Sequence, residues 1–585
     1  MSDRALTTLA RKAGLSPIWT DAHGRRRVVS PDTLKAVLRA LGYMAESRAQ
    51  IAESLREIDH ATPAEEPLDA PRRAHAIARD AKLWAVAVQI YSLPGAGGIG
   101  DFGTLAEFAA DAAKYGADAV AISPVHALFG ARLSHISPYS PSTRLFLNPL
   151  YIPIHDRDLA NNDRLIDWPR VHANRMRVFR KEFDAFPGDE KFDAFVRDGG
   201  DRLLAHARFE LLDQRFVARN IYGWRNWPPE WRDADGASAR ALGADDPEIR
   251  FQLYLQWRAD AALREAQARA KKAGMAIGLI ADMAVGVDPD GSLAWSSRSE
   301  MLDGLNIGAP PDIFNPAGQD WGLTTFSPGG LRAGGFSGFI ATLRAAMRNA
   351  GGMRLDHAMG LRRLWVIPRG ASAADGVYLE YPLESMIKLI VRESIAHNCV
   401  VIAEDLGTVP TGFRGTIARH ALYGMRVLWF ERNGKGDFVL PDAWDKTAAA
   451  LSTTHDLPTI AGWWTDRDIF WRRKTGATAA ATREAKKVRT ADRKKLWRAL
   501  KQARCAKGAI PEAPAPVIDA SLAFLAKTPS PLVIVPAEDL LGLRDQPNLP
   551  GTIDQHPNWR RRLPDVFANK AARRRAALLS ERRKP

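Results

Sequence analysis

The 585-residue chain contains only two cysteines, Cys399 and Cys505. Two cysteines so far apart are too few for a disulfide framework or for a thiolate metal site. No apolar run approaches the roughly 18 residues that a membrane-spanning helix requires. Residues 1–4 are polar, unlike the hydrophobic segment of a secretory signal peptide. We therefore expect a cytoplasmic protein without membrane contact.

Positive charge is not spread evenly along the chain, although the net charge is +15. Residues 472–504 carry 13 Lys or Arg against 2 acids, and residues 560–585 carry 10 against 2. These two segments hold +11 and +8, so the rest of the chain has a balance of −4. That distribution is unlike a dedicated polyanion-binding surface, and a basic helical stripe is most often a solvated face. We expect no nucleic-acid partner.

Eight apolar runs rich in Val, Ile, Leu and Ala recur along the chain, with helical patterns between them. Near-continuous apolar strands are typical of a parallel sheet whose outer face is covered by helices. Eight such units predict a (β/α)8 TIM barrel. The runs are Leu83–Ile90, Ala117–Ile122, Met275–Ala281, Gly352–Leu355, Cys399–Ala403, Met425–Phe430, Ala450–Thr453 and Pro531–Val535.

The segments outside these runs predict additional domains. A gap of about 150 residues between the second and third runs is too long for one loop and predicts an inserted subdomain. Leu34–Leu41 and Ile51–Ile58 have helical patterns, and residues 61–71 have the composition of a linker. The predicted divisions are a small N-terminal helical domain with its linker at 1–72, a catalytic barrel at 73–585, an inserted subdomain at about 130–270 and a basic helical insertion at about 465–527.

Three short motifs each place a carboxylate at the end of an apolar run. Asp356 ends the motif Arg-Leu-Asp, Glu404 lies in Ala-Glu-Asp, and Asp456 ends Thr-Thr-His-Asp, at separations of 48 and 52 residues. Asp282 ends a fourth run. Acids with this spacing can lie at the same end of different barrel strands, where barrel enzymes keep their active sites.

Plural carboxylates suit the cleavage of a glycosidic bond. One carboxylate stabilises or traps positive charge at the anomeric carbon, and one carboxylic acid protonates the departing oxygen. Arg354 lies two residues from Asp356, on the same face of a strand, and its charge keeps that carboxylate ionised. Glu404 has no such neighbour, so we expect its pKa to be raised and expect it to act first as acid and then as base.

Each motif taken alone also has a structural interpretation. Asp405 or Asp456 could cap a helix, Arg354 and Asp356 could form a structural ion pair, and His455 could be a buried core histidine. The joint order of the motifs, each at the end of its own strand-like run, favours the catalytic interpretation.

A glycine-rich segment offers a competing motif. Residues 95–100 form a literal G-x-G-x-x-G between a predicted strand and a predicted helix, as in dinucleotide-binding folds. That fold requires an acid at the end of the next strand to bind the ribose. The next run instead ends in Ser123, and Asp118 lies at its other end, so the dinucleotide interpretation is disfavoured.

In this order, the motifs resemble those of the amylomaltases, which are 4-α-glucanotransferases related to the α-amylases. The resemblance spans about residues 83–563, and residues 6–41 are similar to the N-terminal helical extension of the longer bacterial members. Further segments that resemble the family lie at 92–101, 137–139, 148–149, 308–312, 318–322 and 548–552.

The chain departs from the family pattern at four places around the acids. Two of them are Gln546-Pro547-Asn548 and Glu538-Asp539, where the family more commonly has Arg-Met-Asn and Gln-Asp. Where the family usually has Trp-Gln before a Leu-Pro, this chain has Ala121-Ile122-Ser123-Pro124. Where the family usually has Gly-Asp-Leu-Pro, residues 281–284 read Ala-Asp-Met-Ala. These changes bear on donor and acceptor preference, because the acids themselves are retained.

The resemblance implies a retaining 4-α-glucanotransferase that transfers α-1,4-glucan segments between maltodextrins, without a cofactor or a catalytic metal. An α-glucan hydrolase and a noncatalytic glucan-binding protein are the alternatives, and the oligomeric state stays open. The catalytic residues implied are Asp356 as nucleophile, Glu404 as acid and base, and Asp456 as the group that grips the donor sugar. The substrate-binding residues implied are Tyr139, Asp282, Arg354, His357 and His455, with Asp312 and Trp321 in a loop that borders the acceptor cleft.

Overall fold

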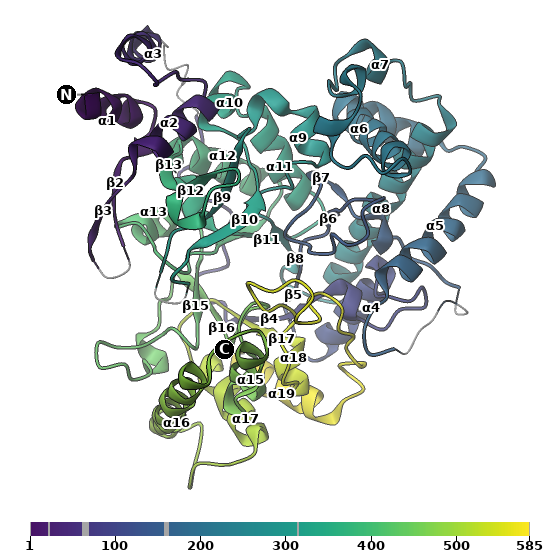
Figure 1. Cartoon of the computed structure of the whole chain (residues 1–585). Coiled ribbons are helices and arrows are strands. Elements are labelled where there is room, and N and C mark those ends of the chain that lie inside the picture. The colour runs from purple at the N-terminus through teal and green to yellow at the C-terminus, as the bar shows by residue number, and fades with distance from the viewer. Residues whose placement is uncertain are drawn as a thin grey trace.

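A computed structural model describes residues 2–21, 24–60, 69–156, 159, 163–312 and 315–583. Eight parallel strands pair side by side in chain order (Figure 1). The last strand pairs with the first, and a parallel bridge between Ile402 and Tyr423 joins the fifth to the sixth, so the sheet closes into a barrel. The strands are β4 (Leu83–Val88), β5 (Ala119–Ile122), β8 (Gly278–Met283), β11 (Gly352–Leu355), β14 (Val400–Ala403), β15 (Gly424–Val427), β16 (Ala448–Leu451) and β17 (Leu532–Pro536). Each predicted run overlaps one strand, so the (β/α)8 TIM barrel is confirmed.

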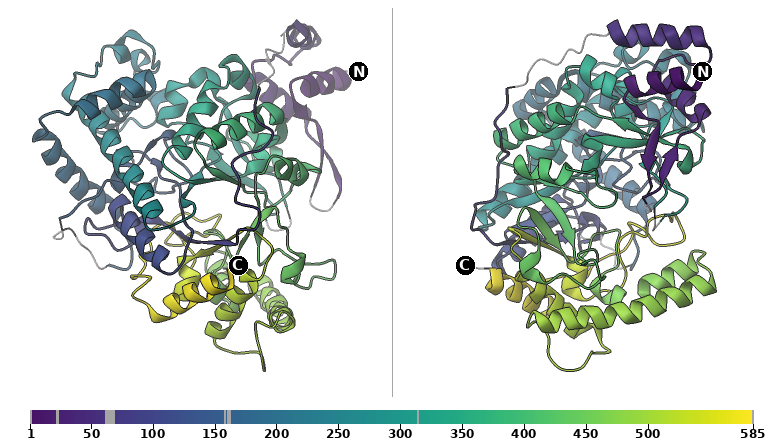
Figure 2. Two further views of the ribbon diagram at one scale, coloured as in Figure 1. Left: turned by 180° about the vertical axis from the view of Figure 1, so that it is seen from behind. Right: turned by 90° about the vertical axis from the view of Figure 1, so that its left-hand side faces the viewer.

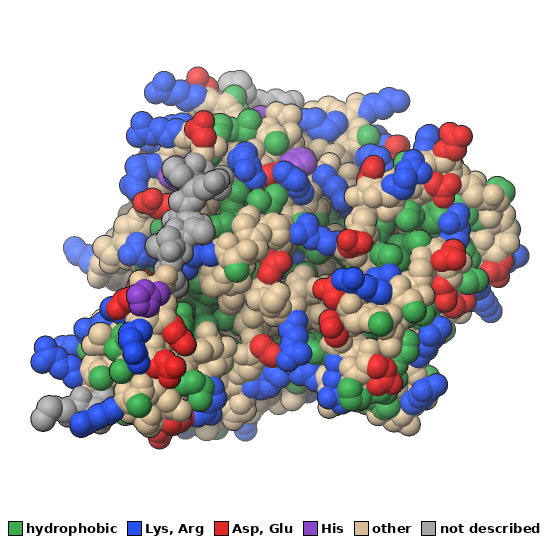
Figure 3. Space-filling view, turned by 90° about the horizontal axis from the view of Figure 1, so that it is seen from above, with side chains coloured by type: hydrophobic (Ala, Val, Ile, Leu, Met, Phe, Trp, Pro, Cys, Tyr) green, Lys and Arg blue, Asp and Glu red, His purple; other side chains and the backbone are tan. Residues whose placement is uncertain are grey.

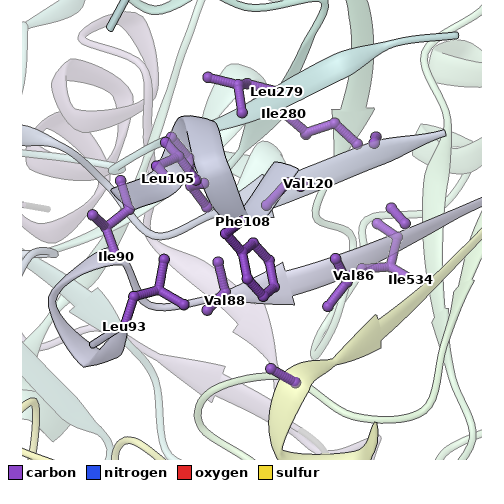
Figure 4. Close-up of a cluster of buried hydrophobic side chains, with 14 of the residues drawn as sticks. Val86, Val88, Ile90, Leu93, Leu105, Phe108, Val120, Leu279, Ile280 and Ile534 are labelled. Atoms are coloured by element: carbon purple, nitrogen blue, oxygen red, sulfur yellow. The ribbon is translucent and has the colours of Figure 1, made fainter. Parts of the chain in front are cut away.

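Helices cover the outer face of this barrel. The first, α4 (Phe102–Lys114), begins where the Asp101 side chain accepts a hydrogen bond from the backbone N–H of Thr104, an N-cap that satisfies one free donor of the first turn. Figure 4 shows side chains of α4 and of the neighbouring strands packed into one buried cluster, which includes Val86, Val88, Leu105, Phe108, Val120, Leu279, Ile280 and Ile534. Full burial of each such side chain contributes about 1.5–3 kcal/mol.

The other α-helices of the described residues follow in chain order. They are α1 (Ser2–Lys12), α2 (Pro31–Ala40), α3 (Arg48–His60), α5 (Trp168–Asp184), α6 (Glu190–Val217), α7 (Ala237–Arg240), α8 (Pro247–Lys272), α9 (Ser292–Ser296), α10 (Pro328–Ala333), α11 (Ser337–Met347), α12 (Leu383–Ala396), α13 (Phe413–Arg419), α14 (Ile460–Trp464), α15 (Arg467–Lys474), α16 (Ala479–Gln502), α17 (Pro514–Ala526), α18 (Ala537–Leu541) and α19 (Lys570–Arg583).

Insertions follow the carboxyl ends of several barrel strands. After β5 come the paired strands β6 (His126–Ala127) and β7 (Thr143–Leu147) and then α5 to α8, and α8 packs against α4. A second, antiparallel sheet has the strand order β1-β13-β12-β9-β10, in which β1 (Leu15–Ser16) comes from the N-terminal segment and the other four strands follow β8 or β11. Its members from the barrel region are β9 (Leu305–Ala309), β10 (Gln319–Leu323), β12 (Arg363–Pro368) and β13 (Val377–Glu380).

The N-terminal segment contains the expected helices and also short strands that the sequence analysis did not anticipate. The strands are β1 (Leu15–Ser16), β2 (Ile18–Thr20) and β3 (Arg26–Val28). Because β1 pairs with β13, this segment shares a sheet with the insertion after β11. Most of the predicted linker, 61–68, lies outside the described residues, and the boundary at residue 72 stays a prediction.

The glycine-rich segment 95–100 forms a tight loop between β4 and α4. A Cβ atom on Gly100 would lie 2.1 Å from the backbone oxygen of Ile90. The buried guanidinium of Arg175 lies against Gly97, donates to its backbone oxygen at 3.0 Å and pairs with Asp101 at 3.2 Å. These glycines therefore make room for neighbouring backbone and for an arginine side chain, which argues against the dinucleotide interpretation.

The two basic segments correspond mainly to α15, α16 and α19. Figure 2 shows α16 as a long helix on the outside of the barrel. Part of its charge is paired within the chain, because Arg489 binds Asp468 at 2.7 Å and Arg493 binds Asp466 at 2.5 Å. On the face drawn in Figure 3, Lys and Arg side chains are interspersed with Asp and Glu. Within the described part of the chain, no helix combines the length and apolar character needed to cross a membrane.

Candidate active site

The predicted acids lie at one end of the barrel. Asp282 is the next-to-last residue of strand β8, Asp356 follows β11 directly, and Glu404 follows β14 directly. Asp456 lies in the loop after β16. Because all strands of the barrel are parallel, these positions share its carboxyl end, as the sequence predicted.

Arg354 joins two of these acids. Its Nη1 atom lies 2.7 and 2.9 Å from the two carboxylate oxygens of Asp282, and its Nη2 atom lies 2.8 Å from Oδ1 of Asp356. The strand register explains the first contact, since Arg354 and Asp282 are partners on adjacent strands. Burial opposes the charge of Arg354, but the surrounding carboxylates, Asp282 foremost, raise its pKa well above the ordinary value. One permanent cation is therefore shared by two carboxylates.

Glu404 is buried and held by two backbone donors. Its Oε2 atom accepts from the N–H of His357 at 2.9 Å, and its Oε1 atom accepts from the N–H of Leu406 at 2.7 Å. Burial raises the pKa of Glu404 to about 7, with a further contribution from the charge of Asp356 and opposition from Arg354. The expected raised pKa is present, so both protonation states are accessible near neutral pH.

A chain of polar contacts runs from Asp282 to Asp456. The Tyr139 hydroxyl donates to Asp282 at 2.6 Å and lies 3.2 Å from Nδ1 of His455, whose Nε2 lies 3.3 Å from Asp456. The rings of Tyr139 and His455 stack with centroids 4.5 Å apart. With the hydroxyl proton directed at Asp282, both ring nitrogens of His455 face acceptors, which favours the imidazolium.

The electrostatics of this series of polar contacts agree with a positively charged His455. Burial alone would lower the pKa of His455, but the charge and hydrogen bond of Asp456 raise it above the ordinary value. Enclosure likewise opposes the ionisation of Asp456, yet His455 lowers its pKa. Asp282 is different, since burial raises its pKa although Arg354 opposes the rise. The different environments of the carboxyl groups therefore move their pKa values apart, as acid–base chemistry requires.

His357 and Trp321 are brought together beside Glu404. His357 has a left-handed backbone with φ of 45°, and burial lowers its pKa to about 4, so its imidazole is neutral. The Trp321 ring, on β10, meets the His357 ring edge-on with centroids 5.1 Å apart. Asp312 lies in the loop between β9 and β10, where its Oδ1 accepts from the N–H of Asn315. Its place at an acceptor cleft stays a prediction.

Three residues join the site without having been assigned a role from the sequence. Asn548 donates from Nδ2 to Asp456 at 2.7 Å, and Gln546 donates to the backbone oxygen of Asp456 at 2.9 Å. The Trp559 ring lies 5.7 Å from Tyr139 and 5.5 Å from His455. Asn548 begins the family-like segment 548–552, which was the available signal. Trp559 had none, because the His455 ring that it contacts lies 104 residues away in the chain.

One neighbour of the acids is structural. Asp405 is fully buried, accepts from the N–H of Met425 at 2.7 Å and pairs with Arg426 at 2.9 Å and Arg414 at 2.7 Å. It ties the end of β14 to β15 and is not a helix cap. Among the described residues, no group of three or more His, Cys, Asp or Glu side chains is arranged to hold a metal ion.

Comparisons with known proteins agree with this geometry. A family model described as 4-alpha-glucanotransferase matches residues 88–568. The 4-alpha-glucanotransferase of Haemophilus influenzae is 32% identical over 541 residues, which are 84% of this chain and 77% of that protein. Its counterpart in Mycobacterium tuberculosis is 33% identical over 553 residues, which are 86% of this chain and 74% of that protein.

Solved structures show the same fold. The amylomaltase from Corynebacterium glutamicum superposes with a TM-score of 0.87 at 26% identity, over 99% of both chains. The amylomaltase from Streptococcus agalactiae in complex with acarbose superposes with a TM-score of 0.70 at 20% identity, over 86% of this chain and 98% of that one. With the barrel, the order of the acids and these relatives in agreement, the chain belongs to the 4-α-glucanotransferase family, and the resemblance to the amylomaltases is confirmed.

Proposed function

We propose that this enzyme transfers α-1,4-glucan segments between maltodextrins by a retaining mechanism in which Asp356 is the nucleophile and Glu404 is the acid and base. The observation that carries the proposal is the contrast between the two groups. Asp356 is paired with the permanent charge of Arg354, whereas the buried Glu404 has a pKa of about 7. One group is suited to attack and the other to proton transfer.

In the first half-reaction, a carboxylate oxygen of Asp356 forms a bond to the anomeric carbon of the donor. The bond from that carbon to the departing O4 breaks, and O4 takes the proton of Glu404. The products are a glucosyl ester of Asp356, a shortened glucan with a free 4-hydroxyl, and the Glu404 carboxylate. The backbone N–H groups of His357 and Leu406 stabilise that carboxylate as it forms.

In the second half-reaction, the 4-hydroxyl of an acceptor glucan attacks the same carbon. Glu404 takes the hydroxyl proton, the ester bond to Asp356 breaks, and the new α-1,4 bond restores the starting configuration. The enzyme returns to its initial protonation state, so no cofactor or metal is required by the balance of the reaction.

The remaining residues are proposed to bind the sugars. Asp456, oriented by Asn548 and His455, grips ring hydroxyls of the distorted donor, and His357 and His455 hydrogen-bond the same sugar. Arg354 orients Asp356. The stacked Tyr139 ring provides an aromatic surface for the donor.

Three further assignments complete the binding site. Asp282 holds Tyr139 and Arg354 in place through its two oxygens. Asp312 and Trp321, in the hairpin of β9 and β10, border the acceptor cleft. Acceptor contacts that exclude water favour transfer over hydrolysis.

We further propose that the protein works in the cytoplasm on maltodextrins. Both of its cysteines are free thiols, Cys399 buried and Cys505 half-buried, which is compatible with a reducing compartment.

The experiment is incubation of the purified enzyme with maltotriose, followed by chromatography of the products. Transfer gives glucose together with a ladder of maltodextrins longer than the substrate. A mixture of glucose and maltose alone, with nothing longer than maltotriose, would identify a hydrolase instead. Recovery of unchanged maltotriose would identify a noncatalytic glucan-binding protein.

A further inference from the structure

A cavity of about 80 Å³ lies on the barrel axis, directly against the site. All eight barrel strands contribute to its wall, mostly with apolar side chains such as Ile280, Ile402 and Met425. Polar side chains of the site, namely Tyr139, Asp282, Arg354 and His455, also line the cavity. The cavity therefore lies beneath the layer of polar side chains, and that layer is proposed to bind the donor sugar.

Three polar side chains that no step of the proposed mechanism uses reach this cavity. Gln89 follows β4, Ser123 follows β5, and Glu538 lies in α18, directly after β17. Their strands are neighbours in the barrel, between β8 with Asp282 and β16 with its His455 loop. Each of the three is at least nine-tenths buried, with exposures of 9%, 4% and 6%. They form one cluster, which we refer to as the barrel-floor cluster.

The barrel-floor cluster has unused hydrogen-bonding capacity. Gln89 Oε1 and Ser123 Oγ find no hydrogen-bond partner within the described part of the chain. Buried polar atoms normally have a partner, either protein or ordered water. A water molecule needs roughly 10–15 Å³ and two to four polar partners, so a cavity of about 80 Å³ has room for several. Water held here can link Gln89, Ser123 and Glu538 to the polar layer above.

Glu538 is the ionisable member of the cluster. Burial raises the pKa of Glu538 to about 7, with a contribution from Asp539 and opposition from His455. Asp539 is itself held by Ser452 at 2.6 Å and by the N–H of Ile460 at 2.7 Å. The titratable and charged groups around Glu538 are His455 from the loop after β16, Tyr91 after β4, Asp539 on its own helix, Arg575 on α19, and Asp282 and Arg354 on the cavity wall.

We propose that Glu538 is a positioning residue for His455, acting through the barrel-floor cluster to keep the imidazole charged and directed at Tyr139 and Asp456. The proposal rests on the proposed function, because it assumes that His455 and Asp456 bind the donor. As Glu538 loses its proton above neutral pH, its negative charge favours the imidazolium of His455. The donor site then keeps its hydrogen bonds at a pH at which an isolated histidine would lose them.

The test is the affinity for acarbose, measured by calorimetry from about pH 5.5 to about pH 9, in the wild type and in Glu538→Gln. Glutamine matches the protonated acid in shape, so at the acid end both proteins bind equally within about twofold. Removing the ionised charge lowers the pH at which affinity is lost by on the order of one unit, as expected for one nearby charge at an effective dielectric constant of about 20.

Two variants serve as controls. Glu538→Asp retains an ionisable group and restores the wild-type pH dependence. Glu210→Gln makes the same change at another buried acid, whose pKa burial raises to about 8 and which lies in the inserted helices away from the cavity, and it leaves the curve unchanged.

Three results would overturn the proposal. The first is coincident pH curves for Glu538→Gln and the wild type, and the second is equal shifts in Glu538→Gln and Glu210→Gln. The third is an affinity loss in Glu538→Gln that is already complete at about pH 5.5, because such a loss would indicate a packing role alone. A wild-type protein that binds no acarbose at any pH would instead refute the proposed function, and the present inference with it.

Discussion

Replacing Glu404 with glutamine separates the two proposed roles of the site. Both carboxylate oxygens accept a backbone N–H, from His357 and from Leu406. Glutamine keeps one acceptor oxygen and must turn its NH2 group toward the other donor. Two buried donors that face each other without an acceptor cost about 1–3 kcal/mol of folding stability. A protein with this extensive core tolerates that cost. The variant should therefore fold, with a modest fall in melting temperature.

The kinetic effect should be far larger than the effect on stability. Proton transfer by a positioned side chain contributes about 10²–10⁴-fold, and Glu404 serves both half-reactions. Turnover of maltotriose should fall by at least that factor. An α-glucosyl fluoride needs little protonation of its leaving group, so it should still glucosylate Asp356. Transfer onward then stalls, because no base remains to accept the proton of the acceptor hydroxyl.

Intact-mass spectrometry provides the assay. Glu404→Gln incubated with the fluoride should gain one glucosyl unit, and the double variant Asp356→Asn, Glu404→Gln should gain none. Peptide digestion should place the adduct on Asp356. An adduct that persists in the double variant, or that maps to Asp456 or Asp282, would show that the roles are assigned to the wrong carboxylates.

Three further predictions test the same site. Asp356→Asn should reduce turnover by several orders of magnitude with the fold intact, and a rate above about a tenth of wild type, equivalent to only about 1.4 kcal/mol of barrier, would reject Asp356 as the nucleophile. The pKa of about 7 for Glu404 predicts that glucosylation by maltotriose declines as pH rises through that value, because the acid must be protonated. Glucosylation by the fluoride should not decline there, and parallel losses for both donors would contradict the assignment. Asn548→Ala removes the donor to Oδ1 of Asp456, so steady-state assays should show kcat/KM lowered roughly 5- to 150-fold, equivalent to a cost of about 1–3 kcal/mol, with at most a modest fall in melting temperature. An unchanged kcat/KM would mean that Asn548 does not orient Asp456.

The sequence alone determined the barrel and the positions of its acids. Strands covered on their outer face by helices must be apolar along their length. Each strand therefore corresponds to an apolar run that is recognisable in the sequence, as at Gly352–Leu355. The residue that follows such a strand faces the carboxyl end of the barrel, and Asp356 and Glu404 could be placed from chain order for that reason. The elevated pKa of Glu404 was also predictable, since no cation lies beside it in the chain.

Contacts between distant segments were decided only by the tertiary structure. Arg354 pairs with Asp282 because the register of two strands aligns them, and the sequence suggested only its pairing with Asp356. Asn548 reaches Asp456 across a separation of 92 residues. The pairing of β1 with β13 and the meeting of Gln89, Ser123 and Glu538 around one cavity likewise depend on barrel closure. Local sequence patterns encode which residues are buried and where each strand ends. Strand register and barrel closure set the distances between residues far apart in the chain, and both are properties of the assembled barrel.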